Sequence, residues 1–181
     1  KERWSHLYMS HELYNVGHLY EAAAAHYQAT GKKNLLNIAV KSANLVVREF
    51  GPGKRTNPPG HEEIEIGLVK LYRVTGTRKY LDLAKFYLDE RGHYFGGERH
   101  APDDPFAVYD LDEYMQNHKP VLEQDEAVGH AVRAMYMYSG MADVAALGGY
   151  PEYVTAIDRL WLDVAGRKQY LTGGVGARSG S

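Results

Sequence analysis

A sequence motif that occurs twice constrains the fold of this chain more than any other feature. Residues 27–39 read YQATGKKNLLNIA and residues 72–84 read YRVTGTRKYLDLA, so Tyr, Thr-Gly, Leu and Ala coincide at an offset of 45 residues. A repeat of this length, written in helix-forming residues around a Thr-Gly turn, is typical of a helix-turn-helix unit that is used repeatedly. The sequence therefore predicts an all-α architecture built from helical hairpins.

The composition narrows the class of protein and of partner. The chain has 181 residues, of which 44% are hydrophobic, with a formal net charge of -2, which fits one soluble globular domain. The near-neutral charge argues against a nucleic-acid partner, and no apolar run approaches the roughly 20 residues of a membrane span, so no membrane partner is expected. The compartment stays open between the bacterial periplasm and the cytoplasm. There is no cysteine, which excludes disulfides and thiolate chemistry within the chain.

Hydrophobic spacing and turn signals predict six helices in three hairpins. Ser10 is the expected N-cap of the first helix, and Gly31 and Gly76 are the expected left-handed ends of the first and third. A long irregular segment is expected at residues 93–123, with an aromatic content that argues against disorder. The predicted helices cover residues 10–29, 33–50, 61–74, 78–91, 124–146 and 151–166.

Such hairpins can stack into an open solenoid or close into a ring with an inner and an outer layer. The first helix of each predicted pair is the more apolar on all sides, whereas the second has one polar face. A helix that is apolar on most sides is buried on most sides, so the sequence favours two layers with the first helix of each pair inside.

The predicted inner helices carry histidines near their starts. His11 and His18 lie in the first helix. His61 and His130 each follow a glycine, near the starts of the other two predicted inner helices. A single histidine on an apolar helix face is more often a hydrogen-bonded core residue than a functional one, but corresponding positions on three helices strengthen the functional interpretation. Glu65 joins these candidates because it lies near His61 on a helix that is otherwise apolar.

Other polar residues have plainer interpretations. His11 and His18 are seven positions apart, about 10 Å along a helix, which is too far to share one metal ion. We therefore expect no metal ligands in this chain. Glu62 and Glu63, and likewise Asp125 and Glu126, are assigned to first turns of helices, where acidic groups interact favourably with the helix dipole. No convincing acid/base pair for glycoside hydrolysis can be chosen from spacing alone.

Several long motifs resemble one family. The chain resembles glycoside hydrolase family 127, the β-L-arabinofuranosidase family, along nearly its whole length and in the same order. The motifs are HELYNVGHLYEA at 11–22, PGHEEIE at 59–65, HKPVLEQDEAVGHAVRAMY at 118–136, YSGMADV at 138–144 and YLTGGVG at 170–176.

The resemblance implies an (α/α)6 toroid as the catalytic domain, followed by β-rich domains. It implies hydrolysis of terminal β-L-arabinofuranosyl units of an oligosaccharide or glycan with retention, through a zinc-bound cysteine nucleophile and a glutamate acid/base. By motif, the sugar-contacting histidines of the family match His18, His61 and His130, with an expected role in hydrogen bonding to sugar hydroxyls.

The same resemblance implies that residues 1–181 form about half of the toroid, without the downstream half and the β-domains. In the family the acid/base and all zinc ligands follow the Gly-rich loop near residue 176, so this chain is expected to hold no catalytic residue and no zinc ligand. We expect the chain alone to be inactive, and its exposed inner-helix faces to promote association. The alternatives are a helical-repeat binding module without catalysis, and a toroid sugar epimerase or lyase.

Overall fold

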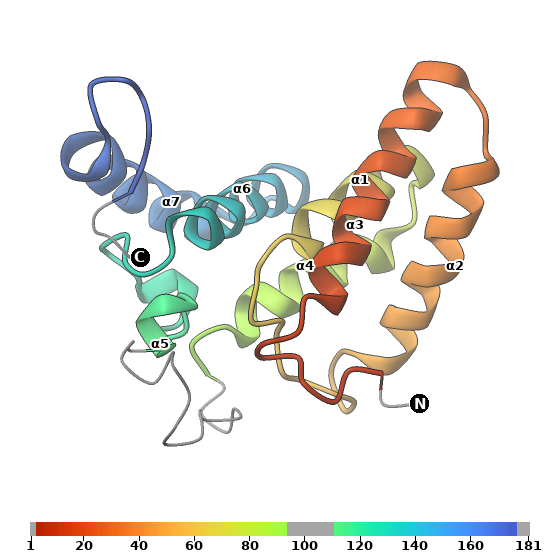
Figure 1. Cartoon of the computed structure of the whole chain (residues 1–181), viewed down its shortest axis with the longest axis horizontal. Coiled ribbons are helices and arrows are strands. Elements are labelled where there is room, and N and C mark those ends of the chain that lie inside the picture. Colours follow the sequence, from red (N-terminus) through yellow and green to blue (C-terminus); the bar gives the residue numbers. More distant parts are fainter. Residues whose placement is uncertain (1–2, 94–110, 177–181) are drawn as a thin grey trace.

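The computed structural model describes residues 3–93 and 111–176, and helices are the main elements of these ranges (Figure 1). Within these ranges there is no strand, only two isolated β-bridges, so the all-α prediction is confirmed. The long helices are α1 (Glu12–Thr30), α2 (Asn34–Glu49), α3 (Ile64–Thr75), α4 (Arg78–Glu90), α6 (Ala131–Gly148) and α7 (Pro151–Asp163). Short helical segments are α5 (Leu111–Tyr114), η1 (Val121–Glu123) and η2 (Val164–Lys168).

The repeated motif forms the same turn twice. Gly31 and Gly76 have left-handed backbones, with φ of 69° and 68°, and their N–H groups donate to the carbonyls of Tyr27 and Tyr72, both at 2.8 Å. The hydroxyls of Thr30 and Thr75 each donate to the carbonyl four residues earlier at 2.7 Å. The sequence repeat is therefore a repeat of helix ends, as predicted.

The hairpins form two layers. α1 packs on α3 and α3 packs on α6, while α2, α4 and α7 pack against their hairpin partners from outside. Figure 1 shows α1 and α3 running side by side, with α2 beside them and the α6–α7 hairpin at the other end of the molecule. The core between the layers contains Tyr20, Leu68, Leu81, Met137 and Leu160. This arrangement confirms the predicted inner and outer helices.

The two inner helices α1 and α3 cross where both carry glycine. A Cβ added to Gly67 would lie 2.9 Å from the Cα of Gly17, closer than such atoms approach in proteins. The missing side chains therefore let the two backbones touch. This close crossing brings the end of the loop before α3 against the middle of α1.

Two predicted helix starts are wrong. α3 begins at Ile64 and not at residue 61, because Glu63 has φ of 157° and ψ of -39°, which no helix contains. α6 begins at Ala131 and not at residue 124, because Gly129 has φ of 74° and His130 is extended. Both segments were predicted helical from hydrophobic spacing and turn signals, yet they form loops before the helices begin.

The predicted N-cap of the first helix is also wrong. His11, and not Ser10, occupies the N-cap position of α1, and no side chain caps that helix. The Ser10 N–H donates to the His6 carbonyl at 2.7 Å, so Ser10 belongs to the preceding turn.

The irregular segment predicted at 93–123 is partly described. Residues 94–110, including Phe95, Phe106 and Tyr109, lie outside the described ranges. Residues 111–123 contain α5 and η1, joined by turns. The side-chain amide of Gln116 donates to the Val128 carbonyl at 2.8 Å, which ties this segment to the loop before α6.

No helix among the described residues is long and apolar enough to cross a membrane. Large apolar side chains exposed on the described surface include Trp161 and Leu162 on the outer helix α7. The association predicted through the inner-helix faces stays a prediction.

Candidate functional site

Histidine and tyrosine rings from three inner elements meet in one cluster. We call it the histidine–tyrosine cluster, and its members are His11, Tyr14, His18, His61, His130 and Tyr136. The sequence had placed histidines at the starts of three inner helices, and the fold brings those starts together. His18, His61 and His130, the predicted sugar-contacting residues, all belong to the cluster.

His61 lies at the centre of the cluster. Its ring centroid is 4.4 Å from that of Tyr14, 5.5 Å from His11, 5.9 Å from Tyr136 and 6.0 Å from His130. It is presented by the loop before α3, which is possible only because α3 begins at Ile64. An irregular backbone at this point turns the ring away from the helix axis and toward α1 and α6.

The hydrogen bond of His61 fixes its tautomer. Nδ1 lies 2.7 Å from the carbonyl oxygen of Glu62, and since a carbonyl only accepts, Nδ1 carries the proton. Burial, followed by the nearby positive charge of Arg133, lowers the pKa of His61 to about 4. His61 is therefore neutral at physiological pH, with Nε2 as a hydrogen-bond acceptor.

His130 has the opposite tautomer. Its Nδ1 accepts a hydrogen bond from the backbone N–H of Arg133 at 3.4 Å, which leaves the proton on Nε2. Burial and then the charge of Arg133 lower the pKa of His130, so it too is biased toward the neutral form. The guanidinium of Arg133 lies 4.5 Å from the ring centroid of Tyr114, which holds this arginine beside the cluster. The cluster thus offers one histidine acceptor and one histidine donor.

His18 faces two carboxyl groups. Its Nδ1 is 3.3 Å from Oε1 of Glu63 and 3.5 Å from Oε2 of Glu21, while its side chain is 40% exposed. Tyr14 packs edge-on against its ring at a centroid distance of 4.5 Å. Glu21 also lies 3.5 Å from Nζ of Lys70.

Three buried glutamates lie next to the cluster. Glu62, Glu63 and Glu65 are each no more than 1% exposed, and Glu62 and Glu63 precede α3, so their assignment to its first turn is wrong. Burial raises the pKa of Glu62 to about 8 and that of Glu63 to about 10. Glu62 lies 3.2 Å from the buried guanidinium of Arg91, whose positive charge acts in the opposite direction. These glutamates are buried because their loop is enclosed between α1, α4 and α6.

Glu65 supports the loop that presents His61. Its Oε2 accepts a hydrogen bond from the backbone N–H of Glu63 at 3.0 Å, and burial raises its pKa. Gly140 of α6 makes room for it, since a Cβ there would lie 3.2 Å from Cβ of Glu65. Its predicted contact with a sugar stays a prediction.

The second pair of acidic residues also lies outside a helix. Asp125 and Glu126 lie in the exposed loop before α6, where they pair with Lys119 and Lys168, both at 2.8 Å. Their assignment to a helix first turn is wrong, because the helix starts five residues later than Glu126. They tie the loop to neighbouring segments and lie apart from the cluster.

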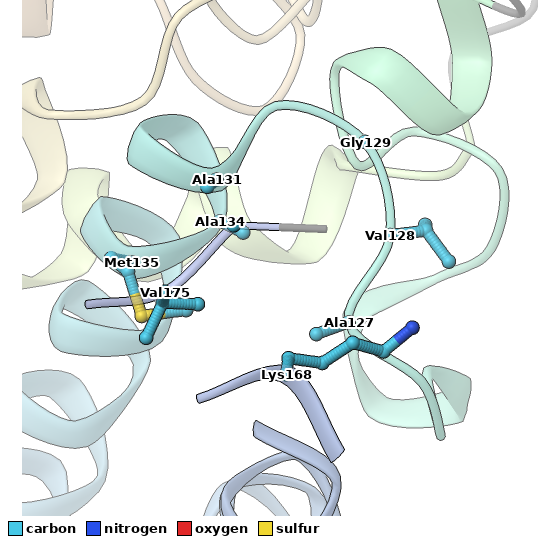
Figure 2. Close-up of a pocket in the computed structure, with 9 residues that line it drawn as sticks. Ala127, Val128, Gly129, Ala131, Ala134, Met135, Lys168 and Val175 are labelled. Carbon is cyan, nitrogen blue, oxygen red and sulfur yellow. The ribbon is translucent and has the colours of Figure 1, made fainter. Parts of the chain in front are cut away.

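A small pocket near the start of α6 is not a second polar site. Figure 2 shows it lined by Ala131, Ala134 and Met135 of α6 and by Val175 of the C-terminal segment. Its one charged lining residue, Lys168, is paired with Glu126. Its lining is therefore suited to packing the C-terminal segment rather than to chemistry.

Comparison with known proteins identifies the family. Residues 1–180 match the family described as β-L-arabinofuranosidase, GH127 catalytic domain. This chain belongs to the GH127 family. A non-reducing end β-L-arabinofuranosidase from Bifidobacterium longum subsp. longum is 37% identical to it over an alignment of 186 positions, which covers 98% of this chain and 28% of that protein.

Solved structures agree with the GH127 assignment. Ara127N, a GH127 β-L-arabinofuranosidase from Geobacillus stearothermophilus T6, superimposes with a TM-score of 0.91 at 42% identity, over 99% of this chain and 29% of that one. A second structure, described as a GH127 β-arabinofuranosidase, gives 0.84 at 53% identity, over 99% of this chain and 27% of that one. The chain thus has the fold of the N-terminal helical part of these proteins and spans less than a third of their length.

The GH127 chain does not contain the donors of the zinc site that the resemblance implies. That site needs cysteine thiolates, and this chain has no cysteine. We therefore derive no step through that metal ion.

Sequence reasoning missed two members of the cluster. Tyr14 is three residues after His11 and four before His18, a spacing that places it on the same helix face, so it could have been found. Tyr136 gives no such signal. It comes six residues after His130, and the packing of both α1 and α6 against α3 brings its ring centroid to 6.0 Å from that of His18.

Proposed function

We propose that this GH127 chain forms the sugar-binding part of a retaining glycoside hydrolase that removes terminal β-L-arabinofuranosyl units from an oligosaccharide or glycan. The observation that carries the proposal is the convergence of His18, His61 and His130 with two tyrosines. In this proposal the nucleophile, the acid/base and the zinc ligands of the hydrolase belong to segments outside residues 1–181. No residue of the chain is assigned a catalytic role.

The chemistry of the cluster suits a small sugar. A sugar hydroxyl both donates and accepts hydrogen bonds, and Nε2 of His61 accepts while Nε2 of His130 donates. Because the pKa of each of these histidines is lowered, both keep these roles throughout the neutral pH range. Tyr14 and Tyr136 add rings that can contact the apolar face of a furanose. The family assignment favours this function over the binding-module and epimerase alternatives.

The test uses the full-length protein and an aryl β-L-arabinofuranoside. His61→Gln is expected to lower kcat/KM about 10- to 100-fold, since a buried hydrogen bond to substrate is lost. His26→Gln, on α1 but outside the cluster, is the matched control and should leave kcat/KM unchanged. Equal rates for the wild type and His61→Gln would contradict the proposal.

A second measurement tests the division of roles. Residues 1–181 incubated with the same substrate and zinc should give no turnover. Turnover by this chain alone would show that it holds a nucleophile and an acid/base, and would overturn the proposed division.

A further inference from the structure

His18, Glu21 and Glu63 offer three ligand atoms to one point in space. These atoms, one imidazole nitrogen and two carboxylate oxygens, all lie within 4.8 Å of one another. They come from α1 and from the loop before α3, so the group exists only because these elements cross closely at Gly17 and Gly67. Spacing along a single helix could not reveal it.

Glu63 is a buried carboxyl group beside the carboxyl of Glu21. Its side chain is 0% exposed, and in its ionised form neither oxygen accepts a hydrogen bond from the described residues, whereas in its protonated form it can share its proton with Glu21. A carboxylate in that situation is expensive unless a cation or a proton compensates it. The unpartnered Oε1 points toward Nδ1 of His18 at 3.3 Å, at a geometry that gives no hydrogen bond.

The spacing of the group matches that of ligands around a metal ion. Two ligand atoms about 2.05 Å from a tetrahedral zinc ion are roughly 3.4 Å apart. His18 Nδ1 lies 3.3 Å from Glu63 Oε1 and 3.5 Å from Glu21 Oε2. Both distances are therefore close to the edge of such a tetrahedron, and the third separation, between Glu21 and Glu63, is within 4.8 Å.

We propose that His18, Glu21 and Glu63 bind a divalent first-row transition-metal ion through nitrogen and oxygen ligands. Imidazole favours such ions over calcium and magnesium, and zinc fits this ligand set. Lys70 contacts Oε1 of Glu21 and leaves Oε2 for the metal. Three protein ligands leave a fourth position for water, and His18 and Glu21 are both partly exposed.

This site is separate from the cysteine-bound zinc that the family resemblance implies, and it does not depend on the proposed function. Binding through Nδ1 leaves Nε2 of His18 free, so the same ring could still contact a sugar. The expectation of no metal ligand in this chain came from spacing along single helices and, for the family's zinc, from the resemblance; the proposal replaces the part that came from spacing.

The first experiment titrates metal-free residues 1–181 with zinc against a chromophoric chelator. One equivalent is expected to bind, and because the chain has no cysteine, thiolates cannot contribute. Glu63→Gln and Glu21→Gln should each weaken zinc binding at least 10-fold. Glu152→Gln and His26→Gln, which remove a carboxylate and an imidazole elsewhere, should not.

The visible absorption spectrum of bound cobalt reports the ligand geometry directly. Co²⁺ added to the wild type should give visible absorption bands of a four-coordinate nitrogen–oxygen site, which Glu21→Gln should lose. Glu21 is half-buried, so this variant tests the site even if Glu63→Gln does not fold. Calcium or magnesium in excess should not displace cobalt, and displacement at equal concentration would overturn the assignment to a transition metal.

Two results would contradict the proposed metal site. No zinc binding, or zinc affinity unchanged in both glutamate variants, would overturn the proposal. The group would then be a pair of carboxyls, from Glu21 and Glu63, that share a proton beside His18.

Discussion

The carboxyl group of Glu63 packs directly against Gly17, in the space that a side chain at position 17 would fill. A Cβ built on Gly17 overlaps Oε2 of Glu63 and lies 2.8 Å from the Cα of Ile64. Gly17 therefore sets both the crossing of α1 with α3 and the position of a buried carboxyl next to His18.

Gly17→Ala is expected to destabilise the chain by about 1–3 kcal/mol, because the added methyl group must displace backbone as well as the Glu63 side chain. Urea unfolding followed by circular dichroism measures this change in the free energy of unfolding. Gly166→Ala is the matched control, since a Cβ at Gly166 meets nothing within 4 Å. Equal effects of the two substitutions would show that the α1–α3 crossing tolerates a side chain.

Arg91 is expected to be among the most sensitive charged residues. It is 1% exposed, lies 3.2 Å from Glu62, and donates to the carbonyls of Pro59 and Met115 at 2.6 and 3.0 Å. Arg91→Ala should cost about 3–5 kcal/mol, since it leaves buried polar groups without partners. Arg78→Ala removes an exposed ion pair with Asp82 and should destabilise the chain far less than Arg91→Ala in the same urea experiment.

Stability is expected to depend on pH through His61. Its pKa is lowered to about 4 in the folded chain, against an ordinary value of 6.5. Between about pH 6.5 and pH 4 the unfolded chain therefore binds a proton that folded His61 does not, and stability falls as the pH decreases. His61→Gln should flatten this part of the stability profile, and comparison with the wild type removes the opposite contributions of Glu62, Glu63 and Glu65. A parallel profile in the variant would contradict the lowered pKa.

The two repeated turns are expected to be sensitive for a backbone reason alone. Gly31 and Gly76 have positive φ, and a Cβ at either position meets nothing within 4 Å. Gly31→Ala and Gly76→Ala should therefore each cost about 1 kcal/mol, as a left-handed residue with a side chain does. Thermal unfolding of both variants should give similar shifts in Tm, and a large difference between them would show that the two turns are not equivalent.

The sequence predicted the hairpins well and the loops before the inner helices poorly. The Thr-Gly turns at Gly31 and Gly76 are local structures, set by one hydroxyl and one left-handed glycine, so their residues alone reveal them. The segments around Glu63 and Glu126 contain ordinary helix-forming residues. Their irregular backbones depend on contacts with distant segments, such as those of Glu63 with Gly17 and of Glu126 with Lys168, which no local pattern encodes.

The sequence by itself determined the all-α class, the two layers and the histidines of the site. Helix periodicity, turn residues and family motifs depend only on residues that are close together along the chain. The tertiary structure decided which side chains meet. It placed Tyr14 and Tyr136 around His61, buried Glu62 and Glu63, and brought Glu63 to His18. The physical reason is that burial and distance between side chains arise from the crossing of helices, and two glycines far apart in sequence set how closely α1 and α3 approach.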